Sequence, residues 1–181
     1  MAKVRPHAVH PALRRWRFTV AAFSVVGAAA LLVPPLFPPT SRLIWNASAS
    51  APLGLYYLTP GHRVFRGELV LAEAPPAARA LAARRDYLPT NVLLVKRVAA
   101  VAGDTICSRG LTIAINGRVV AQRLRRDSQG RPLPHWHGCR VLRANQVFLL
   151  MAQVPDSFDG RYFGAISTKA VIGQLMPLWT W

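Results

Sequence analysis

Three short clusters in this sequence contain side chains that could carry out chemistry, and the first is the run Asn46–Tyr56. Ser48 and Ser50 alternate there with small alanines. We expect the run to be extended, because alternate side chains of an extended chain lie on one face and both hydroxyls would then point the same way. A serine and alanine run is more typical of a linker, and Asn46-Ala47-Ser48 is also a glycosylation sequon. Alone, this cluster does not establish a nucleophile.

The second cluster is Lys96, which lies beside Arg97 in the otherwise apolar run 92–101. A charged lysine is costly to bury, so burial would lower its pKa from the usual value of about 10.4. The neutral amine that results can act as a general base. The alternative is that the Lys96 amine reaches solvent at the edge of a sheet.

The third cluster is the run Asp156–Gly164, which contains two of the seven acidic residues of the chain. We expect Asp159 and Arg161 to share one face of a strand, with Gly160 and Gly164 permitting tight turns. The alternative is an exposed turn whose ion pair contributes less than about 1 kcal/mol to stability. A serine nucleophile with a lysine base needs no histidine or acid, so the three clusters together favour such a pair.

The N-terminal part of the sequence has the composition of a membrane anchor. Residues 1–17 contain five Lys or Arg and no acid, and residues 18–33 contain no charge. Extending the apolar stretch to residue 37 gives twenty residues, about the number that crosses a bilayer core of roughly 30 Å. A cleaved signal peptide, cut near 49–51 and therefore unusually long, and a buried core helix are the two alternatives.

The anchor predicts three regions: a basic cytoplasmic arm over 1–17, a transmembrane anchor over 18–37 and an exported catalytic domain over 38–181. Basic segments stay on the cytoplasmic side of a membrane. We therefore expect a single-pass protein of a bacterial inner membrane, with its N-terminus in the cytoplasm and its catalytic domain in the periplasm.

Composition narrows the possible partners. The chain has 181 residues, with 23 Lys and Arg against 7 Asp and Glu, a net charge of +16 and 52% apolar residues. That apolar content excludes a disordered polycation and is enough for one folded domain with an appended segment. Since the sequence lacks a stacking motif of aromatic and basic residues, we expect no nucleic-acid partner. The positive charge suits instead a bilayer with anionic headgroups.

The exported part is predicted to be mainly β. Short strands are expected at 64–71, 91–102, 111–115, 118–120, 146–151 and 170–175. Asn116-Gly117 is the signal of a type I′ hairpin turn. One helix is expected over Ala77–Arg85, after two prolines, and a long polar loop over 124–138. These elements predict a folded β-sheet or a partly open barrel behind the N-terminal helix.

Cys107 and Cys139 are the only cysteines. In an exported domain they favour a disulfide, which would contribute about 3–4 kcal/mol to stability. The alternative is a pair of free buried thiols. His135 and His137 lie close together in the long loop without a carboxylate nearby, so we interpret them as ordinary loop residues. We expect neither a metal nor another cofactor.

The ordered motifs resemble those of the type I signal peptidase superfamily, and in particular the TraF-type pilin-maturation peptidases of conjugative-transfer systems. The run Asn46–Tyr56, with Ser50 followed by Pro52, is similar to the nucleophile motif of that branch. Val95-Lys96-Arg97-Val98, followed by Gly103-Asp104, is similar to the general-base segment. The run Asp156–Gly164 is similar to the last motif, and Gly67–Val70 to a short strand motif. The resemblance extends from the apolar stretch to about residue 175.

The resemblance implies a role for each matching residue. Ser50 would be the nucleophile and Lys96 the general base, while the Ser48 hydroxyl would join the Ser50 amide in an oxyanion hole. Ser157 would orient the Lys96 amine. Ala51 stands where methionine usually follows the serine, so Ser48 stays open as an alternative nucleophile.

Four further residues receive supporting roles from the same resemblance. Asp159 and Arg161 would hold the strands around the dyad, and in the conjugative branch the aspartate at the Asp159 position is also considered important for activity. Gly103 and Asp104 would be structural.

The function that the resemblance implies is that of a membrane-anchored serine endopeptidase processing an exported pilin-like precursor. Its acyl-enzyme would be released by water, or by the amino terminus of the precursor to give a cyclic product. Components of a conjugation or secretion system would be further partners. A housekeeping signal peptidase and a non-catalytic, membrane-anchored subunit of a secretion channel are the alternatives.

Overall fold

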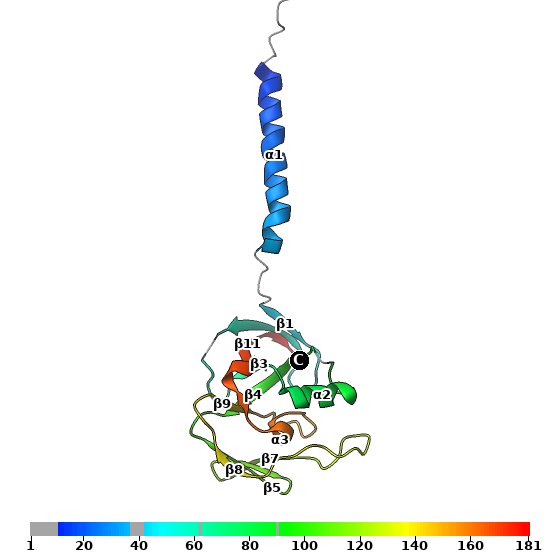
Figure 1. Ribbon diagram of the computed structural model, residues 1–181, viewed down its shortest axis with the longest axis vertical. Coiled ribbons are helices and arrows are strands. Elements are labelled where there is room, and N and C mark those ends of the chain that lie inside the picture. Colours follow the sequence, from blue (N-terminus) through cyan, green and yellow to red (C-terminus); the bar gives the residue numbers. More distant parts are fainter. Residues whose placement is uncertain (1–10, 37–41, 62, 90) are drawn as a thin grey trace, which may run out of the picture. The chain divides into compact units, whose positions relative to one another are not determined.

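The computed structural model describes residues 11–36, 42–61, 63–89 and 91–181, and the chain divides into two compact units, 1–41 and 42–181. In the first unit, helix α1 spans Pro11–Leu36 (Figure 1). Among the described residues, no helix combines the length and the hydropathy that crossing a membrane requires. The predicted basic arm and anchor lie partly outside the described residues, and both stay predictions.

The second unit is mainly β, which confirms the predicted fold class. Its larger sheet has seven strands in the order β1-β2-β11-β3-β4-β9-β10, and every pairing in it is antiparallel. These strands are β1 Leu43–Asn46, β2 Gly54–Pro60, β3 Leu69–Ala72, β4 Leu94–Ala100, β9 Gln146–Leu149, β10 Ile166–Ser167 and β11 Val171–Thr180. The sheet is open, because its two edges, β1 and β10, do not pair with each other.

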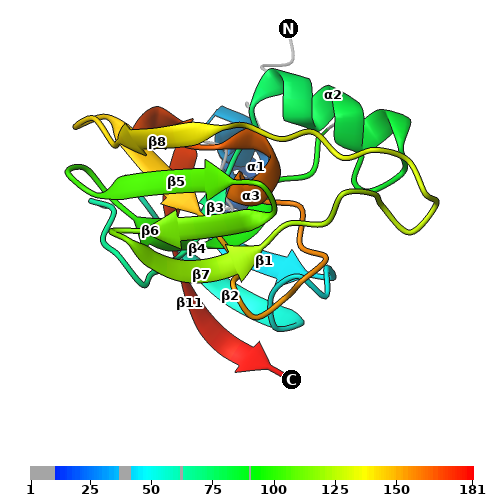
Figure 2. The same cartoon turned by 90° about the horizontal axis from the view of Figure 1, so that it is seen from below.

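A second sheet of four strands has the order β7-β6-β5-β8, and its strands lie side by side in Figure 2. They are β5 Thr105–Arg109, β6 Thr112–Ile115, β7 Arg118–Gln122 and β8 Gly138–Val141. The remaining elements are α2 Pro76–Arg84, α3 Gly160–Phe163 and a 3₁₀ turn over Thr168–Ala170. The predicted disulfide is present and joins the paired residues Cys107 and Cys139 of β5 and β8.

Apolar side chains pack beneath the larger sheet and between the two sheets. One buried cluster belongs to the larger sheet and the loops beside it, and it consists of Ala51, Tyr56, Leu58, Leu71, Val95, Met151 and Leu175. A second cluster joins β4 and β9 to β5 and β6, and it consists of Ala100, Ile106, Ile113, Ile115, Leu142, Phe148 and Leu150. Burial of this apolar surface fixes the small sheet against the large one.

Most predicted elements are present, with shifted ends. The hairpin between β6 and β7 has positive φ at both Asn116 and Gly117, as a type I′ turn requires. The predicted strand at 170–175 continues to Thr180, since β11 pairs with β2 as well as with β3. The sequence does not predict β1, β2, β5, β8, β10 or α3. All of these elements except β2 have five residues or fewer, and pairing with neighbouring strands or local capping forms them rather than a long run of apolar residues.

Candidate active site

Ser50 lies in the connection between β1 and β2, within a tight turn. Residues 49 and 50 form this turn, and the Ala51 amide closes it by donating to the Ser48 carbonyl over 3.3 Å. The prediction of an extended run is therefore wrong. The two hydroxyls nevertheless meet, with Ser48 Oγ 3.1 Å from Ser50 Oγ, because the turn brings them together.

A buried asparagine holds the turn in shape. The Asn46 amide nitrogen donates to the carbonyls of Ser48, Ala51 and Pro52 over 2.9–3.1 Å. The Asn46 Oδ1 accepts the Ser48 amide N–H over 3.1 Å. One short side chain thus satisfies four backbone groups, which is how Asn competes with regular secondary structure.

Tyr56 supports the same turn from β2. It is buried, and its hydroxyl donates to the Pro52 carbonyl over 2.7 Å. Burial raises the pKa of Tyr56, although Arg97 opposes the shift, so the hydroxyl keeps its proton for this bond. Sequence reasoning gave neither Asn46 nor Tyr56 a role in holding the turn. The signal was available, since both belong to the motif that resembles the nucleophile segment of the conjugative branch.

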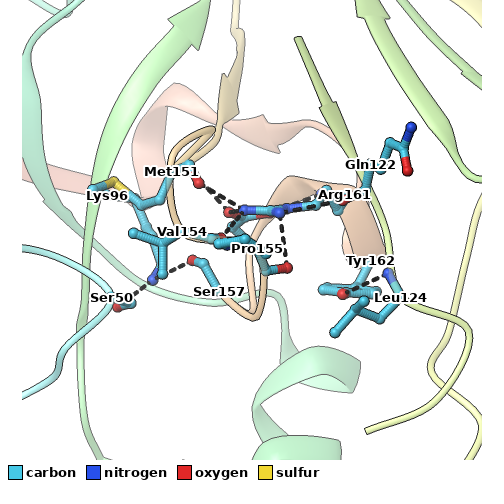
Figure 3. Close-up of polar contacts among 11 residues, drawn as sticks. Ser50, Lys96, Gln122, Leu124, Met151, Val154, Pro155, Ser157, Arg161 and Tyr162 are labelled. Carbon is cyan, nitrogen blue, oxygen red and sulfur yellow. Dashed lines mark hydrogen bonds and ion pairs between the residues drawn. The ribbon is translucent and has the colours of Figure 1, made fainter.

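Strand β4 places Lys96 beside Ser50. Side chains alternate along the strand, so Lys96 is buried and Arg97 is exposed. The Lys96 Nζ donates to Ser50 Oγ over 2.6 Å and to Ser157 Oγ over 3.0 Å (Figure 3). The side chain therefore does not reach solvent at the sheet edge, and residues from three distant segments meet at its amine.

The surroundings of Lys96 raise the fraction of its amine that is neutral. Burial, which leaves the residue 2% exposed, lowers its pKa to about 8. The negative charge of Asp159 opposes this shift, Arg161 adds to it, and Asp156 opposes it. With a pKa of about 8, roughly one lysine in ten is neutral at pH 7.

The Ser48 hydroxyl and the Ser50 amide form a pair of possible donors beside the Ser50 hydroxyl. The Ser50 N–H donates to Ser48 Oγ over 3.4 Å, a long bond that a better acceptor can replace. Both groups lie next to Ser50 Oγ, where a substrate carbonyl oxygen would become negative. Lys96 donates to Ser50 and not to Ser48 among the hydrogen bonds of the described residues, which favours Ser50 as the nucleophile.

Asp159 and Arg161 form a fully buried ion pair behind the site. The prediction that they share a strand face is wrong, because Asp159 caps the short helix α3 and accepts the Arg161 amide N–H. The Arg161 guanidinium donates to both Asp159 oxygens over 2.9–3.0 Å. It also donates over 2.7–3.3 Å to the carbonyls of Met151, Val154, Pro155 and Gln122 (Figure 3). Arg161 therefore fixes the loop 151–157 that presents Ser157 to Lys96.

Gly160, between the two charged residues, occupies a position with no room for a side chain. A Cβ at this position would lie 2.6 Å from the Leu149 carbonyl oxygen and 2.6 Å from the Phe148 ring. The glycine lets α3 begin directly against β9. This close approach brings the Asp159 carboxylate to the Met151 amide, whose N–H it accepts over 3.0 Å.

The other predicted site residues lie away from Ser50. Gly103 and Asp104 form the turn between β4 and β5, where Asp104 accepts bonds from Val101, Asn116 and Arg66. Burial would raise the pKa of Asp104, but the hydrogen bonds from Asn116 and Val101, together with Arg66, lower it overall. This arrangement supports the predicted structural role.

Two adjoining cavities open at Ser50, with volumes of about 330 Å³ and 560 Å³. Both are lined by Ser48, Ser50, Tyr87, Leu88 and Lys96. The smaller cavity continues along a mixed lining of polar residues, namely Asp127, Ser128, Asp156 and Ser157, and of the apolar or aromatic residues Leu124, Leu133, Phe158 and Tyr162. The larger one continues along apolar residues of the segments around β1, β3 and β4, namely Ile44, Leu71, Val92, Leu93 and Val95. An extended peptide that occupied both cavities would pass directly over the Ser50 hydroxyl.

Comparison with known proteins gives the class to which this fold and site belong. The sequence model described as "Signal peptidase, peptidase S26" matches residues 15–180. The chain therefore belongs to the signal peptidase S26 family, which is a family of serine peptidases.

The individual relatives are all named as transfer proteins TraF. A plasmid transfer protein TraF from Escherichia coli is 30% identical over 166 residues, which cover 86% of this chain and 92% of that protein. A second Escherichia coli plasmid transfer protein TraF is 31% identical over 147 residues, or 75% of this chain and 82% of that protein. A probable conjugal transfer protein TraF from Sinorhizobium fredii is 31% identical over 147 residues, which cover 75% of this chain and 76% of that protein.

Among solved structures, a crystal structure of a signal peptidase I from Enterococcus faecalis is similar to this chain. The TM-score is 0.38 and the sequence identity is 20%, over 64% of this chain and 98% of that one.

Proposed function

We propose that this chain is a membrane-anchored serine endopeptidase in which Ser50 is the nucleophile and Lys96 is the general base. One observation carries the proposal: Lys96 Nζ lies 2.6 Å from Ser50 Oγ, in a buried setting that lowers the lysine pKa to about 8. A neutral amine at this distance can take the hydroxyl proton as the serine attacks a carbonyl carbon.

The reaction follows from these positions. Neutral Lys96 takes the Ser50 proton while Ser50 Oγ bonds to the substrate carbonyl carbon, whose oxygen becomes negative. The Ser50 amide and the Ser48 hydroxyl would donate hydrogen bonds to that oxygen. Lys96 then gives the proton to the leaving nitrogen as the C–N bond breaks, which leaves an ester on Ser50. Ser157 keeps the amine directed at Ser50 throughout.

We propose that the substrate is an exported pilin-like precursor of a conjugative-transfer system, whose other components are further partners. Two findings support this. The relatives of this chain are named as plasmid or conjugal transfer proteins, and the nucleophile run Asn46–Tyr56 has the spacing of the conjugative branch. Attack by water on the ester would give a linear product. Attack by the amino terminus of the same precursor would give a cyclic one.

The test is intact-mass measurement of candidate pilin precursors from the same operon, co-expressed with the full chain in membranes. We expect the wild type to shorten one precursor, and Ser50→Ala and Lys96→Ala to leave its mass unchanged. A cyclic product would be lighter than the linear one by one water molecule. Processing by both variants would overturn the proposed dyad.

The same experiment separates the alternative functions. Cleavage of many unrelated exported precursors would indicate a housekeeping signal peptidase. A wild-type chain that processes nothing, and that does not react with a fluorophosphonate at Ser50, would indicate a non-catalytic secretion-channel subunit. Ser48→Ala serves as a graded control, because loss of one oxyanion donor lowers turnover by about 10²–10³-fold without abolishing it.

We also propose that the anchor over 18–37 keeps residues 42–181 in the periplasm, beside an inner membrane with anionic headgroups. Trp45, Trp179 and Trp181 support this location. They are exposed and form a cluster with ring centroids 5.1–6.5 Å apart, and tryptophan favours membrane interfaces. Protease added to spheroplasts should digest this domain, whereas protease added to intact cells should not. Resistance in spheroplasts would contradict the proposed orientation.

A further inference from the structure

Two segments outside the recognised motifs form one wall of the cleft. The segment 85–88 follows α2, and the loop 123–137 joins β7 to β8. Tyr87 and Leu88 line both cavities, together with Ser50 and Lys96. A peptide that fills both cavities must therefore pass these two side chains next to the atoms that react.

Tyr87 is held in place by the long loop. Its hydroxyl donates to the Asp127 Oδ2 over 2.5 Å, although 40 residues separate them in the sequence. The same carboxylate accepts Arg131 Nε over 2.7 Å, and Arg85 Nη1 lies 3.7 Å away. Backbone N–H groups of Gln129 and Arg131 also donate to Asp127. The Asp127 side chain is only 6% exposed, so these contacts surround most of the carboxylate.

An aromatic contact fixes the other side of Tyr87. The Tyr87 and Phe158 ring centroids lie 5.6 Å apart, and Phe158 stacks on Tyr162 at the same distance. Phe158 directly follows Ser157, which holds the Lys96 amine. Leu88 and Phe158 both pack against a buried cluster that contains Ala78 and Leu94. A ring held on two sides cannot move away from the cleft without breaking the hydrogen bond to Asp127 or the contact with Phe158.

We propose that Tyr87 is a specificity-determining residue, which limits the size of the substrate side chain beside the scissile bond, and that Asp127 is the positioning residue that keeps it there. The inference rests on the proposed function, because it takes Ser50 as the nucleophile. Small side chains fit beside a fixed ring, whereas longer or branched ones collide with it. In a pocket of fixed size, two substrates whose side chains differ by one methylene differ in affinity by about tenfold or more.

The test measures size selectivity at Ser50 in the detergent-solubilised full chain. The probes are peptide boronic acids that differ only in the side chain beside boron, which is that of Ala, Val or Leu. Boron bonds reversibly to a serine oxygen, so affinity is read as protection of Ser50 from a fluorophosphonate label. We expect the wild type to bind the Ala probe at least about tenfold more tightly than the Leu probe.

The variants separate a specificity role from a structural one. Tyr87→Ala should bring the Ala-to-Leu ratio close to one, and Tyr87→Phe and Asp127→Asn should each lower it by about fivefold. Since Asp127 acts through Tyr87, the double variant Tyr87→Phe/Asp127→Asn should have the same Ala-to-Leu ratio as either of these single variants. Asp127→Glu, which keeps the carboxylate, should restore part of the ratio. Tyr57→Phe is the matched control, because Tyr57 lies on β2 outside both cavity linings.

The outcomes distinguish failure of the specificity role of Tyr87 from failure of the proposed peptidase function. Wild-type selectivity in Tyr87→Phe and Asp127→Asn proteins that unfold at the wild-type temperature would overturn the specificity role. An equal loss of affinity for all three probes would also overturn it, because it would indicate general damage to the fold. Equal labelling of the wild type and Ser50→Ala would instead overturn the proposed function, and this inference with it.

Discussion

The two sheets of residues 42–181 are held together in different ways. The larger sheet presents Ser50 and Lys96, and buried side chains fix its loops by donating to backbone carbonyls, as Asn46 and Arg161 do. The smaller sheet is joined across β5 and β8 by a disulfide. No residue of its strands lines the two cavities that contain Ser50.

This difference follows from what each sheet must achieve. A hydrogen bond has a preferred distance and angle, so several of them fix the orientation of a reacting group. A disulfide mainly restricts the unfolded chain and does not aim a side chain. The larger sheet therefore needs precise polar contacts, whereas the smaller one needs only to stay folded against it. Four predictions test this comparison.

The largest effect is expected for Arg161→Ala. Removing the guanidinium leaves the buried Asp159 carboxylate without an opposite charge and frees four backbone carbonyls. Breaking a buried pair costs about 3–5 kcal/mol, so we expect a large loss in the free energy of unfolding and no measurable peptidase activity. Urea unfolding and precursor processing measure the two quantities. Full activity in this variant would refute the role of the loop 151–157 in presenting Ser157.

Asn46→Ala is expected to have the next largest effect. Loss of the four bonds to the turn lets Ser50 move relative to Lys96, and a displacement of about 1 Å costs on the order of 10²-fold in turnover. The expected change is in kcat, measured with any cleaved peptide. Asn116→Ala is the matched control in the smaller sheet, where Asn116 donates to Asp104, and its kcat should stay within about twofold of the wild type. Equal losses in both variants would remove the distinction between the sheets.

The pH profile should show the titration of Lys96. Only the neutral amine can accept the Ser50 proton, and the lysine pKa is lowered to about 8. Activity should therefore rise about tenfold from pH 7 to pH 9 and fall further below pH 7. Asp156 raises the lysine pKa through its negative charge, so Asp156→Asn should move the rise toward lower pH. A profile that falls between pH 7 and pH 9 would contradict a lysine base.

The smallest effect on activity is expected for the double variant Cys107→Ala/Cys139→Ala. The two residues are 32 positions apart, and loss of the bond should lower the free energy of unfolding by about 3–4 kcal/mol. Turnover and KM should nevertheless change less than about twofold at temperatures where the domain stays folded. Loss of turnover in folded protein would show that the smaller sheet contributes to the site directly.

Local sequence patterns gave correct expectations where one physical effect dominates. The apolar run around Lys96 predicted a buried strand, and alternation along that strand separates buried Lys96 from exposed Arg97. Asn116-Gly117 predicted the hairpin turn, because few residue pairs adopt positive φ at two successive positions. The two cysteines predicted their own bond.

Expectations were wrong where hydrogen bonds from distant or buried polar groups determine the conformation of the backbone. Ser48 and Ser50 meet in a turn because Asn46 binds three carbonyls around it. Asp159 caps a helix rather than sharing a strand face with Arg161. Periodicity cannot reveal either case, since it records which side chains are apolar and not which carbonyls a polar side chain will bind.

The sequence by itself determined the chemical groups of this protein: a serine, a lysine in an apolar run, and an acid and an arginine spaced two residues apart. Only the tertiary structure brought Ser50, Lys96 and Ser157 within hydrogen-bonding distance, across separations of 46 and 61 residues. It also placed Tyr87 and Asp127 along the same cleft. The physical reason is that burial and hydrogen bonding between distant segments fix such contacts, and both depend on how the sheets pair rather than on any local pattern.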